Sequence, residues 1–202
     1  MRFCLFIIGF FFTFNVFAQR YQTGDLLFQN LDCGELCDAI ESVNEGYKGQ
    51  KFSHIGLVYV KSDSVFIIEA IGNDVHLSTL AQFQSRTGKP LVQARLKSQY
   101  LQLIPNAIIF ALMQLGKPYD DPFLINNGKY YCSELIYDAF AFANNGKPVF
   151  QLQAMTFMEP NTNIYFPAWI KYYKELNIEI PEGKPGINPG GISLSDKIEV
   201  IN

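Results

Sequence analysis

Two apolar segments around a short polar turn most constrain how this chain folds. Residues 52–60 and 65–70 are rich in β-branched and aromatic side chains, and the polar residues 61–64 between them are typical of a tight turn. The pattern predicts an antiparallel β-hairpin in which opposed residues have numbers that sum to about 125. The numbers of His54 and Glu69 sum to 123, so these residues lie near opposition or on the adjacent diagonal, within contact distance if they share a face.

Each of these two residues also has a purely structural interpretation. Strict alternation places His54 on the same face as Gly56, Val58 and Val60, where it is either a hydrogen-bonded core histidine or a side chain that projects into a site. Glu69 ends an apolar run, and a carboxylate there needs a partner unless it faces solvent at the strand end. Taken one at a time, neither residue decides between the two interpretations.

A third reactive side chain, Cys132, begins an amphipathic segment that is expected to form a helix over 132–143. A thiol in the first turn lies near unpaired backbone N–H groups and the positive end of the helix dipole, which favour the thiolate. With His54 as base and Glu69 as the acid that orients it, Cys132 has the partners needed to attack a carbonyl group. Its own N–H would contribute to an oxyanion site. The alternative is a buried helix cysteine without a chemical role.

Five short segments carry a resemblance to a known family: Gly24–Phe28, Phe52–Gly56, Ile68–Ala70, Gly116–Tyr119 and Tyr131–Leu135. With them the chain resembles the circularly permuted NlpC/P60 proteins of the YiiX type, from about residue 23 to the tail at 181–193. In that branch the histidine strand precedes the cysteine helix, as here, whereas ordinary NlpC/P60 enzymes have the opposite order. The resemblance implies a papain-like α+β domain, with an antiparallel sheet or small barrel packed against helices.

The resemblance also implies roles for individual residues. Cys132 corresponds to the nucleophile, His54 to the base and Glu69 to the third member of the triad. Three supporting residues accompany them: Tyr119, Tyr131 and Glu134. The two tyrosines are expected to line the site, and the glutamate is expected to brace the helix. His76 matches no catalytic position and has the pattern of an exposed strand residue.

Three functions follow as expectations from the resemblance. The first is a cysteine amidohydrolase or peptidase that forms an acyl-enzyme, with cell-wall peptides, often γ-D-glutamyl-linked, as substrates. The second is a thiol acyl hydrolase or acyltransferase that acts on N-acyl or lipid substrates. These two functions imply contact with the cell wall or with membrane lipid, respectively. The third is a binding module of the same fold without turnover. The apolar and aromatic residues of 119–131 suit a peptide pocket or an acyl pocket, and no cofactor is implied.

The N-terminal segment predicts an exported protein. Met1-Arg2 is followed by the apolar run 3–14, and Ala18 is the small residue expected before a cleavage site. The apolar run is short for a membrane span. We therefore expect residues 1–18 to be a signal peptide and residues 19–202 to form one catalytic domain in the periplasm or outside the cell.

Charge and cysteine content exclude other classes of function. Without Arg2, 15 of the 16 basic side chains remain against 19 acidic ones, a net charge near −4 without a basic cluster, which disfavours nucleic acid as partner. Cys33 and Cys37 either form a local disulfide and leave Cys132 free, or both stay unpaired. With two histidines in the sequence, and neither at zinc-ligand spacing from a cysteine, no metal site is expected.

Periodicity and turn residues predict the remaining elements. Ser78 is expected to be the N-cap of a short helix that contains Phe83, and the Pro- and Gly-rich tail 181–191 is expected to lie over the surface in extended form. Further strands are expected at 24–28 and 91–96, and further helices at 34–45, 106–115 and 167–176.

Overall fold

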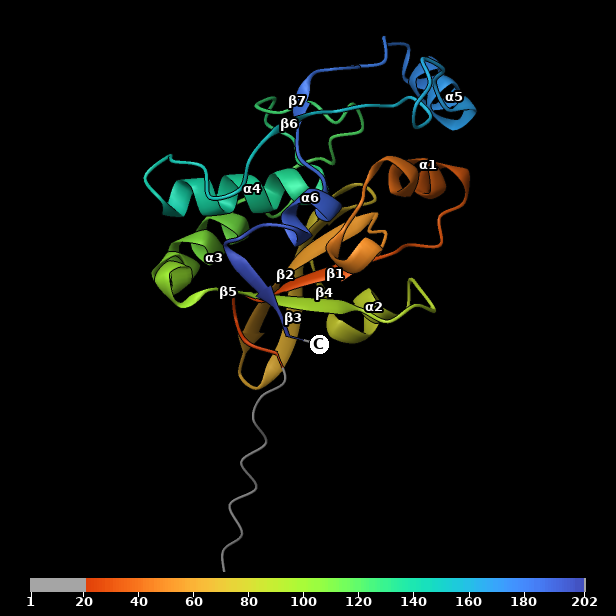
Figure 1. Ribbon diagram of the computed structural model, residues 1–202. Helices are drawn as coiled ribbons and strands as arrows, with labels where there is room; N and C mark the ends of the chain where they lie inside the picture. The colour runs from red at the N-terminus through yellow and green to blue at the C-terminus, as the bar shows by residue number, and fades with distance from the viewer. Residues whose placement is uncertain (1–20, 202) are drawn as a thin grey trace, which may run out of the picture.

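The computed structural model describes residues 21–201 (Figure 1). The predicted signal peptide at 1–18 lies outside these residues. Within the described part, a six-stranded antiparallel sheet has the order β4-β3-β2-β1-β5-β8. Its strands are β1 Leu26–Gln29, β2 His54–Lys61, β3 Ser64–Ile71, β4 Asp74–Thr79, β5 Val92–Leu96 and β8 Ile198–Val200.

The predicted hairpin is confirmed as β2–β3, with the expected register. Leu57 pairs with Ile68, and Lys61 pairs with Ser64, so opposed residue numbers sum to 125. This register sets His54 on the diagonal from Glu69, the arrangement that brings two long side chains on one face into contact.

Two helices cover one face of the sheet. Helix α4 (Cys132–Ala143) packs against β2 and β3, and α3 (Ile104–Met113) packs beside α4 (Figure 1). The alternation along β2 directs Ile55 and Leu57 into the same core as Leu135 of α4. All three side chains are fully buried, and each contributes roughly 1.5–3 kcal/mol of transfer free energy. This packing holds the N-terminus of α4 in place relative to β2.

The opposite face carries the short helix α2 (Leu80–Gln84), whose Phe83 packs with Val58 and Ile67. The expectation that Ser78 caps this helix is wrong, because Thr79 is the N-cap. Gln82 stands three residues after Thr79, and the two side chains form a capping box with each other's backbone N–H groups.

A third region lies beyond α4, at the top of Figure 1. It contains α1 (Glu35–Val43), α5 (Pro167–Leu176) and the two-stranded sheet of β6 (Gln153–Ala154) and β7 (Pro185–Gly186). An aromatic cluster of Phe157, Trp169 and Tyr173 packs against Ala39 of α1. The Cys33–Cys37 disulfide joins the start of α1 to the residues before it, and Cys132 is the free cysteine of the described chain.

The tail is extended at β7, as expected, but its end is helical. The short helix α6 (Pro189–Ser193) interrupts it, because the Asn188 side chain accepts a hydrogen bond from Gly191 N at the helix start. Helix α6 packs against α4 with Ile192 buried, and β8 then joins β5 at the edge of the main sheet. The short 3₁₀ helices η1 (Tyr47–Gly49) and η2 (Ser98–Leu103) complete the element list. Across residues 21–201, no helix is long and apolar enough to cross a membrane.

Candidate active site

Cys132 is the first residue of α4 and is 6% exposed. Tyr131 before it has extended backbone angles, φ −95° and ψ 168°, and no side-chain cap occupies the helix start. The Tyr131 hydroxyl accepts a hydrogen bond from Ile187 N at 3.1 Å, so the C-terminal segment fixes the residue that precedes the thiol. The free N–H groups of the first helical turn therefore lie beside the sulfur, where they favour a negative charge.

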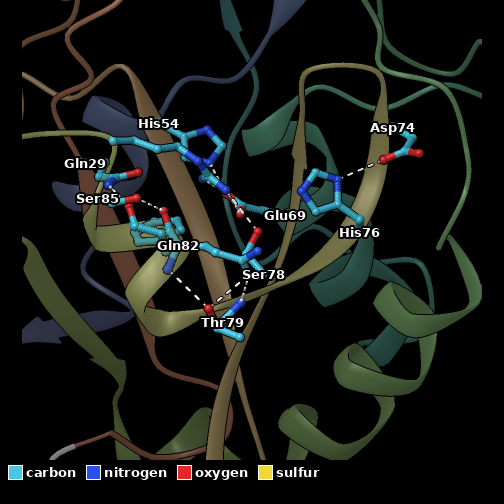
Figure 2. Close-up of polar contacts among 11 residues, drawn as sticks. Gln29, His54, Glu69, Asp74, His76, Ser78, Thr79, Gln82 and Ser85 are labelled. Atoms are coloured by element: carbon cyan, nitrogen blue, oxygen red, sulfur yellow. Dashed lines mark hydrogen bonds and ion pairs between the residues drawn. The ribbon is translucent and has the colours of Figure 1, made fainter.

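His54 is the first residue of β2 and is almost completely buried. Its Nε2 atom lies 2.6 Å from Glu69 Oε2 (Figure 2), which leaves Nδ1 as the ring nitrogen available to Cys132. Burial by itself lowers the pKa of His54, but hydrogen bonds with Cys132 and Glu69 and the negative charges of both outweigh it and raise the pKa to about 9. The imidazolium form is thus stabilised by Cys132 on one side and by the Glu69 carboxylate on the other.

Glu69 is fully buried and is held on two sides. Arg86 donates two hydrogen bonds to it, from one terminal nitrogen to Oε2 and from the other to Oε1, both at 2.7 Å. Burial by itself raises the pKa of Glu69, but the hydrogen bonds from His54, Arg86 and Ser78 lower it to about 2. The carboxylate is therefore ionised throughout the physiological range.

Arg86 and Ser78 are site residues that sequence reasoning missed. The Arg86 guanidinium also donates to Ser78 Oγ at 2.9 Å and lies over the ring of Phe83, 5.6 Å from its centre. A lone arginine in a loop has no periodicity or motif that marks it. The one available signal was indirect: a buried carboxylate at Glu69 needs more than one partner.

We expect Arg86→Gln to lower kcat by about tenfold, equivalent to about 1.4 kcal/mol. Without the bidentate contact, Glu69 loses its fixed orientation and part of the charge that keeps it ionised. The alkaline limb of the pH–rate profile would shift as well, because Glu69, together with Cys132, raises the pKa of His54. Steady-state kinetics between pH 5 and pH 10 measure both effects.

Arg95→Gln is the matched control for this substitution. Arg95 is 25% exposed, against 24% for Arg86, and it also pairs with a buried carboxylate of the sheet, that of Asp25. Asp25 directly precedes β1, whereas His54 pairs with Gln29 at the other end of that strand. Arg95→Gln should reduce thermal stability but leave the pH–rate profile unchanged. If both variants changed the kinetics equally, Arg86 would stabilise the fold without a specific effect on the triad.

The three supporting residues named from the resemblance lie near Cys132 or at the start of its helix. Tyr119 and Tyr131 line a hollow together with Cys132; its empty volume is about 750 Å³. Glu134, in the first turn of α4, is buried and accepts a hydrogen bond from Asn126 N at 3.2 Å, which ties the helix start to the segment before it. Burial and the nearby Asp138 raise the pKa of Glu134 to about 8.

His76 stays outside this group, as expected from its pattern. It lies opposite Glu69 in the β3–β4 register, but its Nδ1 contacts Asp74 Oδ1 at 2.8 Å instead (Figure 2). Its side chain is 40% exposed. The structure therefore brings together Cys132, His54 and Glu69 and leaves the second histidine at the surface.

Comparisons with known proteins identify the family and the fold. Residues 20–201 match the family described as permuted papain-like amidase enzymes, YaeF/YiiX, family C92. The YiiX protein of Escherichia coli K12, described as uncharacterized, is 26% identical over 138 residues, which are 67% of this chain and 65% of that protein. The crystal structure of YiiX from Escherichia coli O157:H7, described as a metalloprotein, superposes with a TM-score of 0.73 at 21% identity. That superposition covers 90% of this chain and 96% of the other, and it shows a shared fold.

Proposed function

Because this chain belongs to the YaeF/YiiX family of permuted papain-like amidases, family C92, we propose that it is a cysteine amidohydrolase with Cys132, His54 and Glu69 as its triad. One observation carries the proposal. A buried His54 contacts Glu69 at 2.6 Å through one ring nitrogen and is hydrogen-bonded to the thiol at the start of α4. A binding module without turnover has no need to bury these three groups in contact.

In the proposed reaction, the Cys132 thiolate attacks the carbonyl carbon of an amide, and backbone N–H groups at the start of α4 stabilise the oxyanion. The His54 imidazolium then donates its Nδ1 proton to the leaving nitrogen, the C–N bond breaks, and an acyl-thioester remains on Cys132. His54 next removes a proton from water, which attacks the thioester and releases the acid and the thiol. Glu69 holds the ring orientation and balances the imidazolium charge throughout.

No step of this scheme passes through a metal ion. The solved YiiX structure is described as that of a metalloprotein, so we tested whether the residues of this chain fit one. Within residues 21–201, no three His, Cys, Asp or Glu side chains are grouped so that they could hold a metal ion. The side chains around Cys132 do not form a metal site of that kind.

We also propose that the protein is exported. The apolar N-terminal segment with Ala18 supports this location. The Cys33–Cys37 disulfide supports it independently, because disulfides persist in the periplasm and outside the cell but are rare in the cytosol.

The test is whether Cys132 is activated and becomes acylated. We expect iodoacetamide near pH 7 to alkylate Cys132 faster than a free model thiol, and an acid-quenched reaction with an N-acyl amide to carry the acyl mass on the Cys132 peptide. Mass spectrometry gives both results. The site assignment is direct because Cys33 and Cys37 are joined and Cys132 is free. Alkylation no faster than the model thiol, or an acyl group on another residue, would contradict the proposal.

A further inference from the structure

Apart from Cys132 itself, the hollow has no charged side chain among the described residues that line it. Much of its wall consists of apolar and aromatic side chains from separate segments: Ile40, Val43, Phe123, Met155, Phe157 and Trp169. Its polar side chains, such as the amides of Asn44 and Asn188, are neutral.

The charges behind this wall are unfavourable for a carboxylate ligand. The pKa of Tyr119 is raised well above its usual value, first by burial and then by the negative charges of Cys132, Tyr172, Asp121 and Asp120. Asp120, the residue after Tyr119, is fully buried. An anion that entered the hollow would therefore lose its hydration, find no cation on the wall and meet acidic groups beyond it.

The cations of the site are already engaged. The His54 imidazolium is placed between Cys132 and Glu69, and both terminal nitrogens of Arg86 donate to Glu69. Neither residue lines the hollow. A carboxylate on the substrate thus has no unpaired positive group to bind, whereas an aliphatic chain gains from each methylene it buries.

From this lining, we propose that the hollow binds the acyl part of the substrate and selects an uncharged, apolar acyl group over one that ends in a carboxylate. The proposal rests on the proposed function, because the acyl group is the part that stays bonded to Cys132 in the thioester. It favours simple N-acyl amides over γ-D-glutamyl cell-wall peptides, whose acyl part carries a free carboxylate. The substrate preference is thereby opposite to the one that the NlpC/P60 resemblance favours.

The direct experiment compares two substrates that differ in one terminal group. Hexanoyl and adipoyl amides of 7-amino-4-methylcoumarin have acyl chains of the same length, but the second ends in a carboxylate. We expect kcat/KM for the hexanoyl amide to be larger by about 100-fold or more, and a ratio below about tenfold would overturn the inference. Where turnover is slow, the rate of thioester formation at Cys132, monitored by mass spectrometry for each of the two compounds, gives the same comparison.

A specificity switch provides a second measurement. Met155 lines the hollow and is partly exposed, so Met155→Lys places an ammonium group of similar length on the wall. We expect this variant to lower the hexanoyl-to-adipoyl ratio by about tenfold or more, through faster reaction of the adipoyl amide. Met158→Lys is the matched control, because Met158 is also partly exposed but does not line the hollow.

The outcomes separate this inference from the proposed function. An unchanged ratio in a folded Met155→Lys variant, or an equal change in Met158→Lys, would overturn the inference while hydrolysis continued. Absence of hydrolysis and of thioester with both amides, together with slow alkylation of Cys132, would instead contradict the proposed function itself. Circular dichroism and thermal melting establish that each variant is folded before its ratio is used.

Discussion

Cys132→Ala is expected to lower kcat/KM for amide hydrolysis by about 10⁴-fold or more, because the proposed acyl intermediate forms on the Cys132 sulfur. The protein should remain folded, since alanine keeps the helical start of α4 and removes one buried sulfur atom. The same change should lower the pKa of His54 from about 9, because Cys132 contributes a hydrogen bond and a negative charge that raise it. Kinetics measure the first effect, and NMR titration of the imidazole measures the second.

The combined variant Cys33→Ser/Cys37→Ser is the control for thiol chemistry. It removes the disulfide but keeps Cys132, so rapid alkylation by iodoacetamide should persist at Cys132. The loss of the cross-link is expected to reduce stability, because the disulfide restricts the unfolded chain. Retention of more than about 1% of wild-type activity in Cys132→Ala would assign the nucleophile to another residue.

Local sequence signals were enough to predict the sheet centre and its principal helices. The β2–β3 register follows from where two apolar runs meet a four-residue turn. It predicts His54 and Glu69 near opposition or on the adjacent diagonal, and the structure has them on the diagonal. The two wrong predictions concern helix starts, where the side chain that bonds to the backbone N–H groups decides where a helix begins. Thr79 rather than Ser78 caps α2 because Gln82 completes a capping box, and Asn188 begins a helix in a tail expected to be extended.

The rest of the site depends on contacts between distant segments, which no local pattern encodes. Arg86 reaches Glu69 from the loop after α2, and the hollow combines walls from α1, the 153–157 segment and α5. The sequence therefore predicts the three reacting residues, whose spacing within a hairpin and at a helix start is local. It does not predict the neutral lining, on which the choice between peptide and acyl substrates depends.

Glu69→Gln tests the other end of the triad and is expected to lower kcat by about 100-fold. The amide keeps the size of the side chain but removes its charge, so the Arg86 guanidinium and the His54 imidazolium face each other without an anion between them. In either orientation, the amide N–H₂ group replaces an acceptor that one of these donors now uses. The imidazolium form of His54 is consequently less stable, and the ion pair with Cys132 is less populated.

The pH dependence gives the sign of this effect. In the wild-type protein the pKa of His54 is raised to about 9, so the stability it contributes is complete below about 6.5, its unfolded value, and is lost as the pH rises through 9. Glu69 acts at the other end, because its pKa of about 2 gives a contribution that is present above about 4.5 and is lost as the pH falls through 2. Removing the Glu69 charge lowers the pKa of His54, so the alkaline limb of activity and of stability should move to lower pH in Glu69→Gln.

Asp25→Asn is the matched control for Glu69→Gln, since Asp25 is an equally buried carboxylate paired with an arginine on the same sheet. Both variants should lower the melting temperature, because each leaves an arginine without its buried anion. Only Glu69→Gln should also change kcat and displace the alkaline limb, because only Glu69 contacts the imidazole. If Glu69→Gln kept wild-type kcat and an unshifted alkaline limb while it remained folded, Glu69 would be a structural partner of Arg86, and the reactive group would be the Cys132–His54 pair alone.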